Sequence, residues 1–216
     1  MSHTISYSTA DKADVLAFLG SSGTGLDADL KRRIPGMLEA ALGHQENLDH
    51  QGVDWGLSIP VALSHLFAGR TDSDAPRAGN AYTAALQHII DFNASDPSDL
   101  GTYSKPATFF GLVDDELSRL GVPADLLPYR YLFGGPGEEF PVLHSVDGYP
   151  AIGHLPLARA KPAADAYRAV LGRIDPDLHH DITQLIGALE FEHEEWERAT
   201  AEVAWYKQDT LFFSLV

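Results

Sequence analysis

Three ionisable side chains recur at helical spacing near the C-terminal end of the chain. Glu190, His193 and Glu197 lie three and four residues apart, so on a helix they would share one face. One imidazole and two carboxylates are ligands that zinc or iron accepts. The stretch falls one residue short of the H-E-x-x-H signature of zinc hydrolases, because Glu197 stands where the second histidine would be. A divalent-metal site is therefore one interpretation of this segment.

The same spacing also fits a packing role for His193. An apolar stripe continues through it on both sides, formed by Ile182, Leu185, Ile186, Leu189, Trp196, Val203 and Tyr206. A histidine on such a stripe packs in or beside the core, with a neighbouring glutamate as hydrogen-bond partner. Further metal ligands would have to come from elsewhere, the candidates being His144, His154, His179, His180 and Asp181. We predict no cofactor and keep the divalent metal as the alternative.

A second group of candidate residues lies in the turn-rich segment 134–154. His144, Asp147, Tyr149 and His154 are catalytic candidates, because imidazole titrates near neutrality and a carboxylate can orient it for acid–base work. The alternative is that these are turn residues only, since Asp147-Gly148 is a turn signal that can close a hairpin.

Aromatic and charged residues provide candidate binding positions. Trp205 and Tyr206 are adjacent, so one helix face cannot bury both, and we expect one to be exposed and to anchor a partner. The candidate binding residues are Trp55, Arg130, Glu138, Glu139, Trp205 and Tyr206.

The elements that must position these residues follow from hydrophobic periodicity and from capping and turn residues. Strands are predicted at 4–8 and 209–216, and the second is expected to be central because both of its faces are apolar. Helices are predicted at 9–20, 26–44, 53–69, 76–92, 113–121, 156–174 and 176–207, with irregular chain at 93–111 and short strands and turns at 122–155. The pattern predicts an α+β fold with a mixed sheet that includes the N-terminal and C-terminal strands and is packed by several helices. We expect a single domain over 1–216, with a helix-rich half at about 1–121 and a strand, turn and helix half at about 122–216.

The amino-acid composition excludes several classes of function. The 216 residues carry a formal charge of −16 and no cysteine, which excludes disulfides, Fe–S clusters and thiol catalysis. The negative charge disfavours nucleic acid and anionic membranes as partners and suits a basic protein partner. No signal peptide and no apolar run long enough to span a bilayer is visible, so we expect a cytoplasmic protein.

The order of features after Tyr131 resembles a known group of proteins. An apolar run ending in Gly-Gly (131–135), an acidic loop and "DGYPAIGHL" (147–155) precede two helices and a terminal strand. This order is similar to that of the YfbM-like group of small uncharacterised bacterial proteins, and the chain also looks similar to actinobacterial proteins of unknown function. The resemblance covers mainly residues 131–216, and it implies an α+β fold without implying an activity.

Two classes of function follow from these observations. The first is an acidic interaction or regulatory protein that binds a partner protein or a small ligand. The alternative is an enzyme of specialised metabolism that uses histidine and carboxylate side chains, with or without a metal. Convergence of Asp147, Tyr149, His154 and His193 around a cavity would favour the enzyme. The sequence does not predict the oligomeric state.

Overall fold

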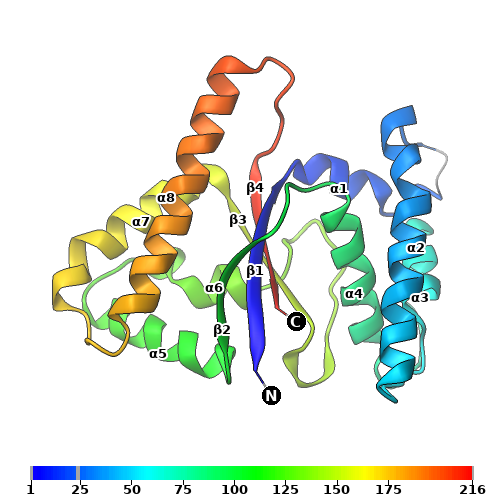
Figure 1. Ribbon diagram of the computed structural model, residues 1–216, viewed down its shortest axis with the longest axis horizontal. Coiled ribbons are helices and arrows are strands. Elements are labelled where there is room, and N and C mark those ends of the chain that lie inside the picture. The colour runs from blue at the N-terminus through cyan, green and yellow to red at the C-terminus, as the bar shows by residue number, and fades with distance from the viewer. Residues whose placement is uncertain (1, 23–24, 216) are drawn as a thin grey trace. The chain divides into compact units, whose positions relative to one another are not determined.

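The computed structural model describes residues 2–22 and 25–215, and it divides into two compact units (Figure 1). The unit that we call the sheet unit comprises Met1–Thr9, Pro97–Gly137 and Ile152–Val216. The unit that we call the helical unit comprises Ala10–Asp96 and Glu138–Ala151. Each unit draws on both halves distinguished in the sequence, and the single domain over 1–216 stays a prediction.

Within the described residues, one sheet contains four strands in the order β2-β1-β4-β3. These are β1 (His3–Ala10), β2 (Ser98–Tyr103), β3 (Ala151–Pro156) and β4 (Thr210–Leu215). The α+β class and the presence of both terminal strands in one sheet are confirmed. Neighbouring strands run antiparallel, not in the mixed directions that were predicted (Figure 1). Each strand begins at the end of the sheet where the preceding strand finishes, so consecutive strands run in opposite directions.

The C-terminal strand β4 lies in the interior of the sheet, as its sequence predicted. Leu211, Phe212 and Phe213 are all buried, although consecutive side chains point to opposite faces. Both faces of this strand are therefore covered, which explains why its sequence is apolar throughout rather than alternating.

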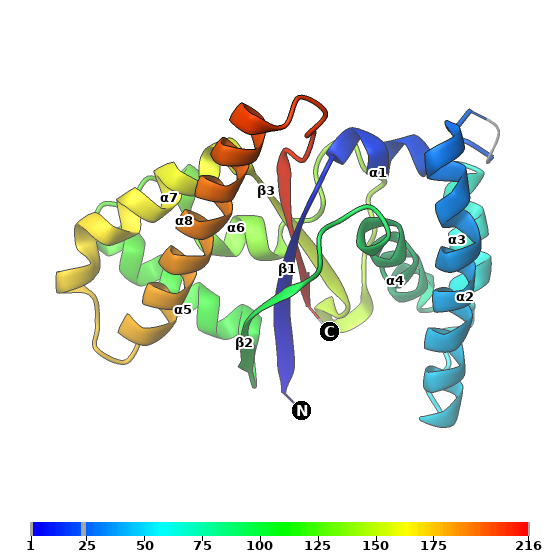
Figure 2. The same ribbon diagram turned by 45° about the horizontal axis from the view of Figure 1, so that its top comes forward.

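Four α-helices accompany the strands in the sheet unit: α5 (Pro106–Arg119), α6 (Pro128–Phe133), α7 (Leu157–Val170) and α8 (His179–Glu202). Helices α7 and α8 pack along each other (Figure 2). The buried stripe of α8 consists of Ile182, Leu185, Ile186, Leu189 and His193. The predicted stripe is confirmed from Ile182 to His193, but Trp196 is only half-buried, and Val203 and Tyr206 lie beyond the end of the helix, which was predicted to run to residue 207.

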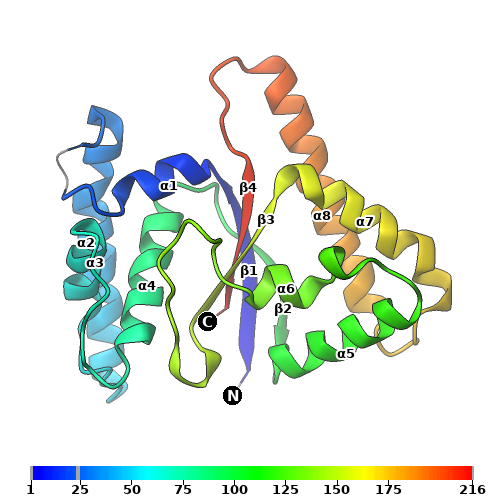
Figure 3. The same ribbon diagram turned by 180° about the vertical axis from the view of Figure 1, so that it is seen from behind.

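The helical unit is built from α1 (Lys12–Phe18), α2 (Ala28–His50), α3 (Ile59–Phe67) and α4 (Ala78–Asp91). Helix α4 is its most buried element and packs against α1, α2 and α3. The segment 138–151 runs beside α4 (Figure 3). This segment contains most of the residues that the sequence marked as catalytic candidates.

The prolines at positions 35 and 60 do not break their helices. Helix α2 continues through Pro35, which is an exposed residue. Pro60 occupies the first turn of α3, where its missing N–H has no intrahelical partner to lose. Helix α3 therefore begins at Ile59, with Ser58 as N-cap, and the predicted helix start near residue 53 is wrong.

Two elements were not predicted from the sequence. Strand β2 lies in a stretch rich in Ser, Asp and Gly that local propensity marks as irregular, but it pairs with β1 in antiparallel register. Helix α6 lies where short strands were expected, and Pro128 opens its first turn. Tertiary pairing in the first case and an N-terminal proline in the second outweighed the local pattern.

Candidate functional site

His193 lies in α8 as a buried side chain with a backbone partner. Its exposed fraction is 7%, and Nδ1 donates to the carbonyl oxygen of Leu157 at 3.0 Å. A carbonyl only accepts, so Nδ1 carries the proton. On the other side of the ring, Nε2 lies 3.3 Å from Glu197 Oε1. These contacts fit the packing interpretation.

Glu190 is engaged by a cation instead of by His193. Arg168 on α7 makes a two-point contact with its carboxylate, with Nε donating to Oε1 at 2.8 Å. The Glu197 side chain is 65% exposed. Across residues 2–22 and 25–215, no group of three or more His, Asp or Glu side chains is placed to hold a metal ion. Glu190, His193 and Glu197 share a helix face, but they are not assembled as a ligand set.

The four catalytic candidates are divided between the two units. His144, Asp147 and Tyr149 belong to the helical unit, whereas His154 belongs to the sheet unit with His193. His154 Nδ1 donates to the carbonyl oxygen of Gly135 at 2.8 Å, and the Asp147 side chain lies outside the described atoms. Neither unit by itself contains the whole set.

Residues 144–150, which we call the strap, are held against α4 by hydrogen bonds to side chains of that helix. Asn80 is buried and donates from Nδ2 to the carbonyl of Tyr149 at 2.8 Å, while its Oδ1 accepts from the N–H of Val146 at 2.8 Å. Ser145 Oγ donates to Thr83 Oγ1 at 3.1 Å. The side chain of His144 is exposed. The strap is thus a docked structural segment of the helical unit.

The predicted binding residues have separate environments. Trp55 precedes α3, is half-buried and contacts His44 edge-on, with ring centroids 6.4 Å apart. Arg130 is exposed on α6. Glu138 is exposed, and Glu139 accepts from Lys12 Nζ at 2.8 Å within the helical unit. Among the described contacts, none joins two of these four residues, so they do not form one binding site.

Trp205 and Tyr206 lie just beyond the end of α8 at Glu202. Trp205 is 81% exposed, and Tyr206 is half-buried with its hydroxyl donating to Gln208 Oε1 at 3.1 Å. The expectation that one of the two is exposed is confirmed. On α8 itself, Phe191 is 58% exposed, so two large aromatic side chains face solvent in this region.

Carboxylates lie beside these aromatic side chains. Glu195 is one helical turn from both Phe191 and Glu192. Burial raises the pKa of the half-buried Glu192 carboxyl, and the negative charge of Glu195 raises it further. Burial also raises the pKa of the Tyr206 phenol, and the charges of Glu192 and Glu195 add to this. Glu192, Glu195 and Tyr206 therefore lie close enough to interact electrostatically.

Residues 190–207 contain few positively charged side chains. Residues 190–207 contain six glutamates, one arginine and one lysine. Arg198 pairs with Glu195. Among the described residues, no lysine or arginine forms an ion pair with Glu192. We call Phe191, Glu192, Glu195, Trp205 and Tyr206 the α8–β4 surface.

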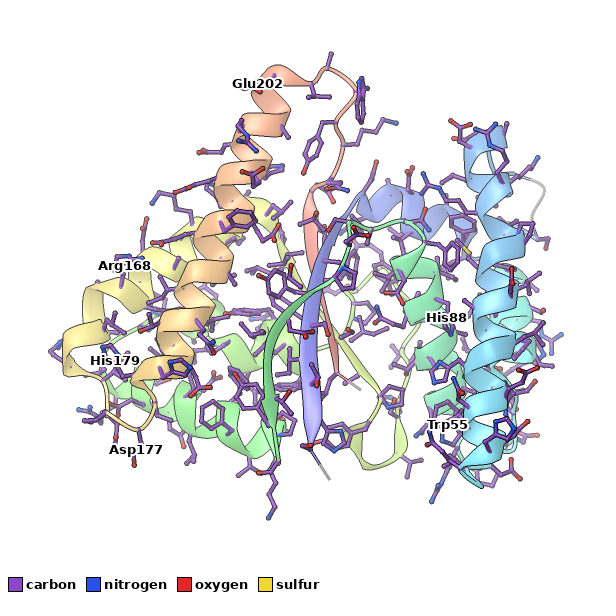
Figure 4. The ribbon with its side chains drawn as sticks, viewed as in Figure 1. Trp55, His88, Arg168, Asp177, His179 and Glu202 are labelled. Carbon is purple, nitrogen blue, oxygen red and sulfur yellow. The ribbon has the colours of Figure 1, made fainter. Side chains whose placement is uncertain are left out.

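Sequence reasoning did not single out one pair of side chains in the helical unit. His44 on α2 and His88 on α4 contact each other through Nδ1 and Nε2 at 3.2 Å. Figure 4 shows His88 on the side of α4 that faces α2. The available signal was weak: each histidine sits near the apolar stripe of a predicted helix, and nothing in the sequence links two positions 44 residues apart.

The hollows described in the sheet unit lie around the turn between α7 and α8. One is lined by residues that include Ile174, His179, His180 and Thr183, and the other by residues that include Leu112, Asp115 and Asp177. His179 and Asp177 mark this turn in Figure 4. His179 and His180 are exposed, and neither hollow contains a predicted catalytic or binding residue.

None of the described helices is both long and apolar enough to cross a membrane.

Comparison with known proteins identifies the family to which the chain belongs. No curated protein and no solved structure matches the chain. Residues 1–214 match the profile of a family described as a domain of unknown function, DUF7691. Because this match spans nearly the whole chain, the protein belongs to the DUF7691 family.

Proposed function

We propose that the protein is a binding module whose α8–β4 surface docks an arginine-rich segment of a protein partner. The observation that carries the proposal is Trp205, an indole that is 81% exposed and is followed in the chain by Tyr206, whose pKa is raised by the charges of Glu192 and Glu195. Exposed tryptophans are costly to leave in water, and tryptophan is enriched among the residues that dominate binding energy.

The charge of the surface favours a cationic occupant. Glu192 is half-buried and has no cationic partner among the described ion pairs, and the carboxylate of Glu195 lies close to it. A cation placed beside them would replace a repulsion between like charges by an attraction. The overall charge of −16 would also steer a basic partner toward the protein during diffusion.

Arginine fits this surface better than lysine does. Its planar guanidinium can bond carboxylate oxygens at two points and can stack on an aromatic face, whereas a lysine ammonium acts as a compact point charge. The α8–β4 surface offers both kinds of partner, with carboxylates at Glu192 and Glu195 and aromatic faces at Phe191 and Trp205. An arginine-containing segment could therefore use both at once.

Fluorescence anisotropy of fluorescein-labelled nona-arginine tests this proposal. We expect the full chain to bind the peptide, and to bind labelled nona-lysine more weakly. Trp205→Ala should weaken nona-arginine binding by about threefold to thirtyfold, the range expected for loss of a cation–π contact. Leu42→Ala removes another exposed apolar side chain, 54% exposed on α2, and should change the Kd by less than twofold.

Equal affinities for the wild type and Trp205→Ala would refute the proposed role of the indole. Equal affinities for nona-arginine and nona-lysine would refute the preference for guanidinium. The resemblance to the YfbM-like group and the cytoplasmic location remain predictions beside this proposal, and neither is needed for it.

A further inference from the structure

His44 and His88 form an imidazole pair between two helices of the helical unit. His44 Nδ1 and His88 Nε2 are 3.2 Å apart, and the ring planes are nearly perpendicular at 78° with centroids 5.4 Å apart. Both side chains are half-buried. Trp55 contacts His44 from the loop before α3. One ring nitrogen from α2 and one from α4 thus contact each other beside an indole.

Burial favours the neutral form of both imidazoles. Burial lowers the pKa of His44, and burial together with the proximity of His44 lowers the pKa of His88 to about 4. A neutral imidazole pair has one N–H pointing into the contact and one nitrogen lone pair accepting it. Metal binding to histidine requires the neutral form, so no proton has to be removed from either ring in advance.

The distance between the nitrogens matches that of two ligands on one metal ion. Zn–N bonds of about 2.0–2.1 Å at a tetrahedral angle place two nitrogens roughly 3.3 Å apart. A metal ion can therefore replace the hydrogen bond, bound to both nitrogens and displaced to one side of the line between them, after rotation of the two rings. The proton of that hydrogen bond moves to the other nitrogen of its own ring, so each imidazole stays neutral.

We propose that His44 and His88 form a binding site for a borderline transition-metal ion such as Zn²⁺, Cu²⁺ or Ni²⁺. Imidazole nitrogens suit these ions, whereas Ca²⁺ and Mg²⁺ prefer oxygen ligands. In the described part of the chain no third His, Asp or Glu joins the pair, so water completes the coordination. The site differs from the one considered at Glu190, His193 and Glu197, which lies in the sheet unit.

Metal binding at this pair has two consequences that can be measured. The ion links α2 to α4, so it stabilises the folded helical unit by mass action. Cu²⁺ quenches nearby indoles, and Trp55 lies against His44. The double variant W196F/W205F leaves Trp55 as the only tryptophan of the three in the chain, so its emission reports on this site.

The experiment titrates Cu²⁺ into full-length W196F/W205F and follows the emission of Trp55. We expect saturable quenching with one ion per chain, and at least a tenfold loss of apparent affinity in either H44Q or H88Q. H50Q removes an exposed histidine from the last turn of the same helix α2, and it should leave the titration unchanged. In the unmutated chain, Zn²⁺ at a hundredfold excess over its Kd should raise Tm by about 5 °C.

Two results would overturn the proposal. One is quenching that H44Q and H88Q leave unchanged, which would assign the copper to other histidines. The other is an equal Zn²⁺ effect on Tm in the wild type and in both variants. Circular dichroism of H44Q and H88Q establishes that each variant is folded, and H44Q alone suffices if H88Q does not fold.

Discussion

Buried and half-buried polar side chains of this protein form hydrogen bonds with backbone groups at several positions. His193 and His154 each donate from Nδ1 to a carbonyl oxygen, and Asn80 bonds both a carbonyl and an N–H of the strap. A buried backbone group without a partner costs free energy comparable to a lost hydrogen bond. These side chains therefore tie segments together, and their removal should be measured first as a change in stability.

Asn80→Ala should lower the free energy of unfolding by about 2–4 kcal/mol. The substitution removes the two hydrogen bonds that Asn80 makes to the carbonyl of Tyr149 and to the N–H of Val146, and each bond lost at such a shielded contact costs about 1–2 kcal/mol. Urea denaturation of the full chain measures the change. Asn47→Ala, at an exposed position of α2, should alter stability by less than about 0.5 kcal/mol. An equal effect of the two substitutions would contradict the role given to Asn80.

His193→Ala should also destabilise the protein by about 2–4 kcal/mol. It creates a cavity and removes the hydrogen bond from the ring to the carbonyl of Leu157. Glu197→Gln should cost less than about 1 kcal/mol, because the Glu197 side chain is 65% exposed and a contact made by a solvated carboxylate contributes little. The stability difference between the wild type and each of these two variants should be the same with and without EDTA. A large effect of EDTA that disappears in both variants would instead support a metal at His193.

Single residues were predictable from sequence where the local pattern determines them. The apolar stripe of α8 placed His193 in the core, and adjacency alone implied that Trp205 or Tyr206 would be exposed. The contact between His44 and His88 depends on the way α2 packs on α4, which is a tertiary property. For the same reason the sequence could not show that Arg168 would bind Glu190.

At the scale of elements, Gly79 on α4 allows the strap to pack closely against the helix. A Cβ on Gly79 would overlap the carbonyl oxygen of His144 in the strap. Gly187 on α8, in contrast, has no other atom within 4 Å of the place where its Cβ would be. Both glycines are helical, Gly79 in the first turn of α4 and Gly187 in the interior of α8, so substituting each with alanine compares an obstructed position with an open one.

Gly79→Ala should lower the free energy of unfolding by about 1–3 kcal/mol, because the strap must move away from α4. Gly187→Ala should raise it by about 0.5–1 kcal/mol, because alanine loses less backbone entropy in a helix. Thermal unfolding followed by circular dichroism measures both. Stabilisation by both substitutions would show that the strap does not approach α4 as described.

The histidine pair between α2 and α4 should make stability depend on pH. The folded pKa of His88 is about 4 and lies below the unfolded value of about 6.5, so the unfolded chain binds more protons between these values. Unfolding free energy should therefore fall as the pH drops from about 6.5 towards 4. H88Q should show a smaller fall than the wild type in urea titrations with EDTA at pH 7, 5.5 and 4.5. An equal fall in the two proteins would contradict this assignment.

Elements with a strong periodic pattern were predicted, and elements that depend on pairing were not. Strand β4 and helix α8 have continuous apolar patterns, so their type and position follow from sequence. Strand β2 has almost no strand-forming residues and exists because β1 supplies hydrogen-bond partners and the contacts Thr4–Thr102 and Ser6–Asp99. The short helix α6 shows no amphipathic period because it is only six residues long.

At the scale of the whole molecule, the dominant property is a charge of −16. A charge of this size attracts any polycation at low ionic strength, so binding of a basic peptide alone does not identify a surface. We infer a local effect, in which the carboxylates of the α8–β4 surface contribute more to peptide binding than their share of the total charge. Variants that change the total charge equally at different places separate the local effect from the general one.

The most direct measurement compares two such double variants in nona-arginine binding by fluorescence anisotropy at about 150 mM salt, where distant charges are screened beyond roughly 8 Å. E192Q/E195Q alters the α8–β4 surface, and E39Q/E46Q removes the same charge from exposed positions of α2. We predict at least about a tenfold loss of affinity for E192Q/E195Q and less than about twofold for E39Q/E46Q. Equal losses in the two variants would contradict the claim that the α8–β4 surface is the docking site.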